Sequence, residues 1–143
     1  MKTVIQILQA KGDEVCTVSP QVSVYDALKI MAENDIGALV VVEAEKVVGI
    51  FSERDYARKM ILKDRSSKDT PVRKVMTERV ITIDPATTIE VCIDLMTYRH
   101  IRHLPVIENN HLIGIVSIGD ILKAIFLEHV HRIEYRESCF AGN

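Results

Sequence analysis

The sequence predicts an α/β (α+β) fold in which one β-α-β-β-α unit occurs twice, with the two units packed sheet against sheet around a pseudo-twofold axis. Residues 17–60 align without a gap on residues 82–125, at a constant offset of 65 residues. Both copies contain the same pattern, GIFSERD at 49–55 and GIVSIGD at 114–120. A unit of this size buries too little surface to fold alone, so we expect the two copies to share their packing.

Each copy begins with a short β segment, residues 15–18 and 80–83, followed by a proline. An amphipathic helix is expected next, because apolar residues then recur at helical spacing. Ser23 and Thr88 precede these two helical runs. Serine and threonine are favoured at the position before a helix, so both are predicted N-caps.

Two short apolar strands follow the helix in each copy, at 38–42 with 47–51 and at 104–107 with 112–116. The connections EAEK and ENNH are short and polar, which is typical of a β-hairpin. A second helix is predicted to begin at Ser52 in the first copy and at Ser117 in the second.

The segments outside the repeats complete the predicted organisation. Residues 1–64 are expected to form the first repeat with an N-terminal helix, and residues 65–143 the linker, the second repeat and a C-terminal helix. The linker lies at 61–76, and we expect the run at 4–10 to play the matching part for the first copy. The last helix carries more apolar residues than its repeat requires, which predicts a partner surface; these are Ile121, Leu122, Ile125, Phe126, Val130 and Ile133.

Composition excludes several classes of function. A net charge of −2 and the absence of tryptophan argue against a nucleic-acid-binding protein. No apolar run approaches the roughly 20 residues of a membrane span, and there is no signal-peptide core, so a cytoplasmic location is predicted. The five histidines have no recognised metal-ligand spacing, and no motif for a nucleophile or a phosphate loop occurs. We therefore expect no metal, no catalytic cofactor and no enzymatic activity.

The duplicated unit, with its Gly-apolar-apolar-Ser-x-x-Asp motif after the third strand, resembles the cystathionine-β-synthase (CBS) domain. Over residues 15–126 the chain is similar to a tandem CBS pair, or Bateman module, of the small stand-alone type found in bacteria and plant organelles. The resemblance implies a regulatory module that binds an adenine nucleotide or related adenosyl ligand, such as AMP, ADP, ATP or NAD, in clefts between the repeats. It also implies a homodimer.

The repeated motif has a structural and a functional interpretation. A serine followed three residues later by an acidic residue forms a capping box, and this alone would explain one copy. The same position also lies beside free backbone N–H groups, where a phosphate can bind. By resemblance and by chemistry, Asp55 and Asp120 are predicted to accept hydrogen bonds from a ribose diol, with Ser52 and Ser117 beside them.

The phosphate would need cations. In related modules the basic residues before Leu-Pro-Val face the phosphates, which assigns that part to Arg102 and His103; alternatively, both are solvated at a strand start. Arg54 is a further candidate. Thr77 and Glu78 approach the first site from the linker, and Ile101 flanks the cleft for the adenine.

The two sites are predicted to differ. Where the second copy has Arg102 and His103, the first has Gly37 and Ala38, so the Asp120 site faces a wall of Ile36 and Gly37. Its own motif contains Gly119 in place of Arg54. We expect the Asp55 site to prefer a charged nucleotide, and the second site to be weaker, to accept a less charged group, or to hold the other end of a dinucleotide such as NAD.

Two functions of different classes follow. The first is a nucleotide sensor whose occupancy alters the packing of the repeats and so a regulated partner protein. The second is a ligand-independent dimerisation or protein-interaction module that uses the long last helix.

Overall fold

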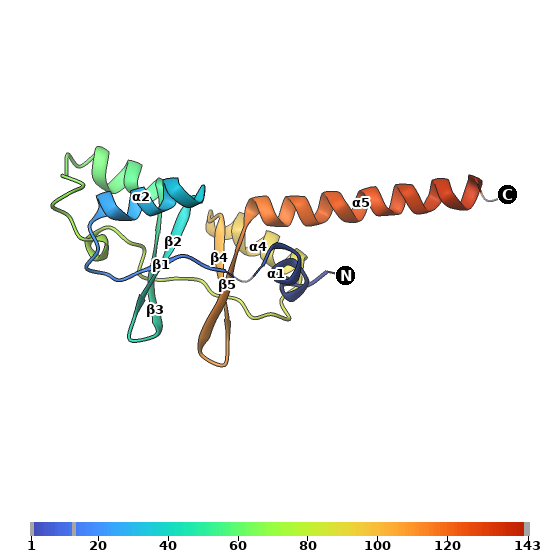
Figure 1. The fold of residues 1–143 in the computed structure, drawn as a ribbon, viewed down its shortest axis with the longest axis horizontal. Coiled ribbons are helices and arrows are strands. Elements are labelled where there is room, and N and C mark those ends of the chain that lie inside the picture. The colour runs from blue at the N-terminus through green and yellow to red at the C-terminus, as the bar shows by residue number, and fades with distance from the viewer. Residues whose placement is uncertain (1, 13, 142–143) are drawn as a thin grey trace.

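The computed structural model describes residues 2–12 and 14–141 and contains two units side by side, each with a β-hairpin and covering helices (Figure 1). The first unit consists of β1 (Thr17–Val18), α2 (Val24–Asn34), β2 (Ala38–Glu43), β3 (Lys46–Ser52) and α3 (Glu53–Tyr56), which continues as a π-helical turn at Ala57–Ile61. The second consists of α4 (Ile89–Arg99), β4 (His103–Glu108), β5 (His111–Ser117) and α5 (Ile118–Ala141). Before them lie α1 (Val4–Lys11) and a 3-10 turn at Val72–Lys74. This arrangement confirms the predicted duplicated α/β fold.

The two sheets differ in one strand. In the first, β1 pairs parallel with β2, and β2 pairs antiparallel with β3. In the second, β4 and β5 form the hairpin, and the expected strand at 80–83 is reduced to a single parallel bridge between Ile83 and Val106. Pro105 explains the loss, because its carbonyl accepts from Ile83 but it has no N–H to donate one step further along the ladder.

The helix caps follow the prediction. The Ser23 hydroxyl accepts from the Asp26 N–H at 3.1 Å, and the Thr88 hydroxyl accepts from the Val91 N–H at 3.3 Å. Glu53 N–H donates to the Gly37 carbonyl at 3.1 Å, and Ile118 N–H donates to the corresponding Arg102 carbonyl at 2.9 Å. The strand-to-helix junction that carries each Ser-x-x-Asp motif is therefore built alike in the two repeats.

The two hairpin turns have the same backbone but different residues. Ala44 and Glu45 have φ of 51° and 64°, and Asn109 and Asn110 have φ of 51° and 65°. Two-residue turns with positive φ at both positions favour asparagine followed by glycine, whereas alanine and glutamate are strained there.

We expect the double substitution Ala44→Asn, Glu45→Gly to raise the free energy of unfolding by about 1 kcal/mol, because it relieves this strain. Urea denaturation measures the change. The second hairpin supplies the reciprocal control, since Asn109→Ala should lower stability by a similar amount. Equal stability of all three proteins would contradict the strain argument.

Each repeat has its own hydrophobic core. The first contains Leu39, Phe51 and Met60, and the second contains Leu104 and Ile121. Cys92 is buried in the second core, as expected from its position in the apolar repeat. Burial raises the pKa of its thiol to about 11, so it is an inert core residue.

The segment that precedes each repeat packs on the other repeat. Val4, Ile7 and Leu8 of α1 lie in the second core, and Thr3 bridges to Thr88. Our expectation that the run at 4–10 serves the first copy is therefore wrong. The reason lies in the backbone, because α1 is tied to the loop before α4 by hydrogen bonds such as Val4 N–H to the Thr87 carbonyl at 2.9 Å.

The linker, which precedes the second repeat, packs on the first repeat. Val72 and Val75 are buried in the first core, and Val72 N–H donates to the Val22 carbonyl at 2.8 Å. The division into residues 1–64 and 65–143 stays a prediction. It describes the order of segments along the chain and not their packing, because α1 packs on the second repeat and the linker packs on the first. Contact between β3 and β5 brings the two sheets together, so the exchanged segments and the sheets jointly hold the repeats in place.

Candidate functional site

A groove of about 1260 Å³ lies between the two repeats. The first repeat contributes the end of β3 and the start of α3, and the second contributes the end of α4 and the start of β4. The lining residues are Gly37, Ile50, Ser52, Glu53, Arg54, Asp55, Arg58, Lys59, Thr77, Met96, Thr97, Arg99, His100, Ile101, Arg102, His103 and Ile118.

Asp55 is the most constrained side chain of this groove. It is only 8% exposed, and its Oδ2 accepts from the backbone N–H of Ser52 at 3.0 Å and from the Ser52 hydroxyl at 3.1 Å. Its Oδ1 accepts from the Thr77 hydroxyl at 3.2 Å and lies 3.1 Å from Lys59 Nζ. These contacts hold the carboxylate in one orientation at the wall of the groove.

The capping interpretation and the site interpretation of this motif are both compatible with the structure. Ser52 and Asp55 form a full capping box at the start of α3. The same two side chains line the groove. The cap therefore fixes the Asp55 carboxylate in the position from which it would contact a ligand.

Five cationic side chains surround the groove: Arg54, Arg58, Lys59, Arg99 and Arg102. Only two acidic residues, Glu53 and Asp55, accompany them. Arg54 also joins the repeats, because its Nη1 donates to the His100 carbonyl at 2.5 Å. The groove therefore presents positive charge on a chain whose net charge is −2.

His103 lies at the boundary between the two predicted sites. It lines the groove, and a side chain on Gly37 would meet its ring at 3.6 Å. Burial lowers its pKa below the usual value, with Lys11 and Arg102 acting in the same direction and Asp120 opposing them. The imidazole is therefore neutral at pH 7, which leaves it as a hydrogen-bonding group and not as a charge for phosphate.

The groove brings together eight of the predicted site residues, whose binding roles stay predictions: Gly37, Ser52, Arg54, Asp55, Thr77, Ile101, Arg102 and His103. Gly37 was expected on the wall of the Asp120 site, but it lines the groove that holds Asp55. Glu78 is exposed and does not line it. Ile36 lines an adjoining depression of about 400 Å³ beside α2, which shares Gly37 and Glu53 with the groove. Ser117, Gly119 and Asp120 of the second motif do not line the groove, although Ile118 of the same motif does.

Several lining residues were not predicted from the sequence, among them Arg58, Lys59 and Arg99. Arg58 and Lys59 follow Asp55 by three and four residues, and that spacing places side chains on one helix face. This signal was therefore present in the sequence. Arg99 had no comparable signal, because the packing of the end of α4 against the first repeat is what places it here.

The second motif has a different environment. Lys11 Nζ lies 2.7 Å from Asp120 Oδ2, which also accepts from the Ser117 N–H at 2.8 Å. Partial burial by itself would raise the pKa of Asp120, but the hydrogen bonds from Lys11 and Ser117 outweigh it and lower the pKa below its usual value. This aspartate is thus ionised and already paired within the chain.

The part of the chain that the structure describes has neither a cluster of metal-binding side chains nor a helix suited to cross a membrane. Within residues 2–12 and 14–141, no three His, Cys, Asp or Glu side chains gather in a way that would hold a metal ion. In the same part of the chain, no helix combines the length and the apolar character of a membrane span.

The chain is similar to known CBS-domain proteins. The sequence profile of the CBS domain matches it twice, over residues 11–62 and 72–127. The mitochondrial CBS domain-containing protein CBSX3 of Arabidopsis thaliana is 41% identical over 151 residues, covering 98% of this chain and 72% of the relative.

Solved structures agree with the sequence comparison. The CBS-domain containing protein ATU1752 of Agrobacterium tumefaciens is 38% identical and superposes with a TM-score of 0.82, covering 86% of this chain and 98% of that one. The CBS domain pair of protein MJ0100, solved in complex with 5′-methylthioadenosine and S-adenosyl-L-methionine, is 25% identical with a TM-score of 0.80. That match covers 90% of this chain and 98% of MJ0100's pair.

Proposed function

The chain belongs to the CBS-domain family as a tandem pair, and on this basis we propose that it is a non-catalytic sensor that binds an adenine nucleotide in the groove at Asp55. CBS-pair proteins are regulatory modules, and the MJ0100 pair binds adenosyl ligands. The ligands proposed are AMP, ATP or NAD, with those that carry more than one phosphate preferred. A homodimer, a cytoplasmic location and a regulated partner protein are part of the same proposal.

The observation that carries the proposal is the pairing of one oriented carboxylate with a cationic wall. Asp55 is held by Ser52 and Thr77 at the groove, and both hydroxyls of a ribose can donate to a carboxylate. Hydrogen bonds to a charged group contribute about 1.5–3 kcal/mol each. Arginine in particular binds phosphate through two parallel N–H donors, so Arg54 and Arg102 are suited to the phosphate chain.

Charge favours a ligand with several phosphates. Five Lys and Arg side chains against two acidic ones leave a local excess of three positive charges. A monophosphate neutralises less of this excess than a triphosphate or a dinucleotide does. Lys59, which pairs with Asp55, can move to a phosphate when the ribose takes the carboxylate.

The apolar part of the groove is suited to the base. Ile50, Met96, Ile101 and Ile118 line it from both repeats. Adenine is a flat ring system, and burying it against such side chains removes apolar surface from water at about 25 cal/mol per Å².

A ligand in this groove would contact both repeats at once. Asp55 and Thr77 hold it from the first repeat and its linker, while Arg102 and His103 lie on the second. Ligand occupancy can then favour one packing of the repeats over another, but only to the extent that affinity differs between the two arrangements. This is how nucleotide level would be passed to a partner.

A ligand-independent interaction module is the second candidate, and α5 is the observation in its favour. This helix extends well beyond the body of the molecule (Figure 1). Leu122 is 61% exposed and Phe126 is 65% exposed on it. An apolar surface of this kind marks a protein contact.

Thermal unfolding with added nucleotides distinguishes the two candidates. At 100 times its dissociation constant, ATP or NAD should stabilise the protein by about 2.7 kcal/mol, which is about 5 to 11 °C in Tm for a chain of this size. AMP should shift the Tm less at equal concentration, and inorganic triphosphate serves as the control for anion binding alone. No shift with any adenine compound would favour the interaction module.

A further inference from the structure

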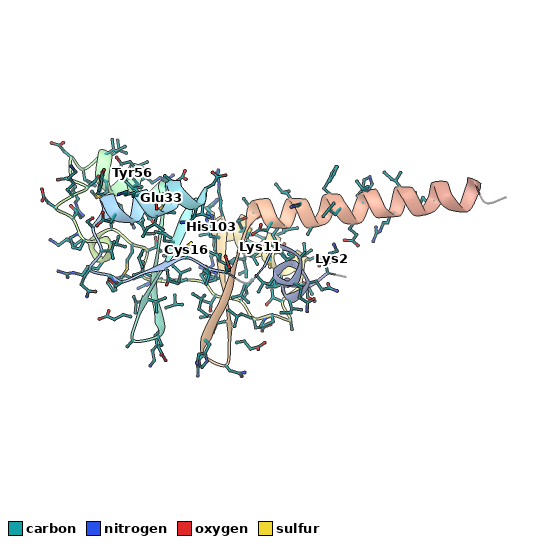
Figure 2. The ribbon with its side chains drawn as sticks, viewed as in Figure 1. Lys2, Lys11, Cys16, Glu33, Tyr56 and His103 are labelled. Atoms are coloured by element: carbon teal, nitrogen blue, oxygen red, sulfur yellow. The ribbon has the colours of Figure 1, made fainter. Side chains whose placement is uncertain are left out.

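Asp120 of the second motif pairs with a lysine of the same chain, Lys11. Figure 2 shows Lys11 and His103 beside the strands of the second repeat. Lys11 Nζ bonds Asp120 Oδ2 at 2.7 Å and also donates to the Ile115 carbonyl at 2.8 Å. The ammonium therefore satisfies two acceptors at the end of β5, in the place where a sugar hydroxyl would donate to Asp120.

Lys11 is presented by a fixed element. It lies in the last turn of α1, whose Val4, Ile7 and Leu8 are buried in the second core. Backbone hydrogen bonds also join the start of α1 to the loop before α4. The backbone that carries Lys11 is thus anchored against the repeat whose aspartate it contacts.

The corresponding lysine of the first repeat makes the same two kinds of contact, since Lys59 Nζ lies 3.1 Å from Asp55 Oδ1 and donates to the Val75 carbonyl at 3.0 Å, but its position relative to the groove differs. Lys59 reaches Asp55 from the next turn of the same helical segment, and it lines the groove, where a phosphate can take it. Lys11 is not among the residues that line the groove, whereas the half-buried His103 is. If a ligand displaced Lys11 from Asp120, the lysine would therefore have no phosphate in the groove to pair with.

We propose that Lys11 is a resident occupant of the second site, which restricts the protein to one adenosyl ligand per chain. This inference rests on the proposed function, because it assumes that the Asp55 groove takes such a ligand. A partly exposed ion pair contributes little to stability, about 0 to 1 kcal/mol, so substitution of Lys11 should leave the fold intact.

The test uses the full chain and 5′-methylthioadenosine, an uncharged adenosyl compound that does not require a phosphate site. In equilibrium dialysis at saturation, Lys11→Met should raise the count from about one ligand per chain to about two, because a second carboxylate is then free to accept the diol. Adding Asp120→Asn to that variant should return the count to about one. Lys123→Met, on the exposed face of α5, controls for loss of a lysine as such.

A second readout needs no ligand. The charged groups that face His103 are Asp120, Lys11, Arg102 and, beside Gly37, Glu53. Lys11→Met removes a cation and leaves Asp120 unpaired, so the pKa of His103 measured by NMR titration should rise. An unchanged titration would show that Lys11 is not the counter-ion of Asp120 and would overturn the proposal.

The outcomes separate the two proposals. Two ligands per chain in the unmodified protein, or one in Lys11→Met, would overturn the restriction by Lys11 while leaving the Asp55 groove as a binding site. Absence of binding by every variant would refute the adenosyl-binding function, and a raised His103 pKa would then support only the pairing of Lys11 with Asp120.

Discussion

The substitution Asp55→Asn is expected to weaken ATP binding by about 2 to 3 kcal/mol, a roughly 30- to 150-fold loss of affinity. The amide keeps the size of the carboxylate but loses its charge, so two charge-assisted hydrogen bonds to the ribose become ordinary ones. Its NH₂ group also faces the Thr77 hydroxyl and Lys59, which are donors to Asp55 Oδ1. Isothermal titration calorimetry measures the change.

Asp120→Asn is the matched control, because it alters the same residue type in the second motif. Since Asp120 pairs with Lys11 and does not line the groove, its substitution should leave ATP affinity within about twofold of the original, a change of about 0.4 kcal/mol. Urea denaturation of both variants checks that each remains folded. Equal losses of affinity in the two variants would contradict the assignment of the site to Asp55.

The substitution Leu8→Ala is expected to lower the free energy of unfolding by about 2 to 5 kcal/mol. Leu8 is 4% exposed and is buried in the core of the second repeat, so its removal leaves a cavity there. Gln9→Ala, at an exposed position of the same helix, should change stability by less than about 0.5 kcal/mol. Chemical denaturation gives both values.

A substitution at Gly114 of β5 tests whether α1 packs on the second repeat. A Cβ at this position would lie 2.7 Å from Leu8 Cδ2, so Gly114→Ala should cost about 1 to 3 kcal/mol through overpacking. In the Leu8→Ala background the same substitution should cost much less, because the clashing side chain is gone. Strictly additive effects of the two substitutions would mean that α1 does not pack on β5.

The elements of the fold were largely predictable because their signals are local. Ser23 and Thr88 cap their helices through backbone donors three residues away, and the strands of each hairpin are close in sequence. One error followed from the same reliance on local signals. The segment at 80–83 reads as a strand, but Pro105, more than twenty residues later, removes the donor that would extend its pairing.

The candidate site was predictable only in part. Alignment of the two copies, with the family resemblance, identified Asp55, Thr77 and Arg102, and the groove brings them together. The prediction that the two sites differ was based on two replacements between the copies. Gly37 and Ala38 stand where the second copy has Arg102 and His103, and Gly119 stands where the first copy has Arg54. The structure contains a further difference in Lys11, which no spacing in the sequence connects with Asp120.

The sequence by itself determined the duplicated unit, its caps and hairpins, and the two aspartates, because each depends on residues that are neighbours in the chain or on the comparison of one copy with the other. Only the tertiary structure decided that α1 completes the second core, that Arg99 joins the groove and that Lys11 pairs with Asp120. The physical reason is that these contacts join residues distant in sequence. Packing and backbone pairing between the repeats bring such residues together, and a linear pattern does not record that.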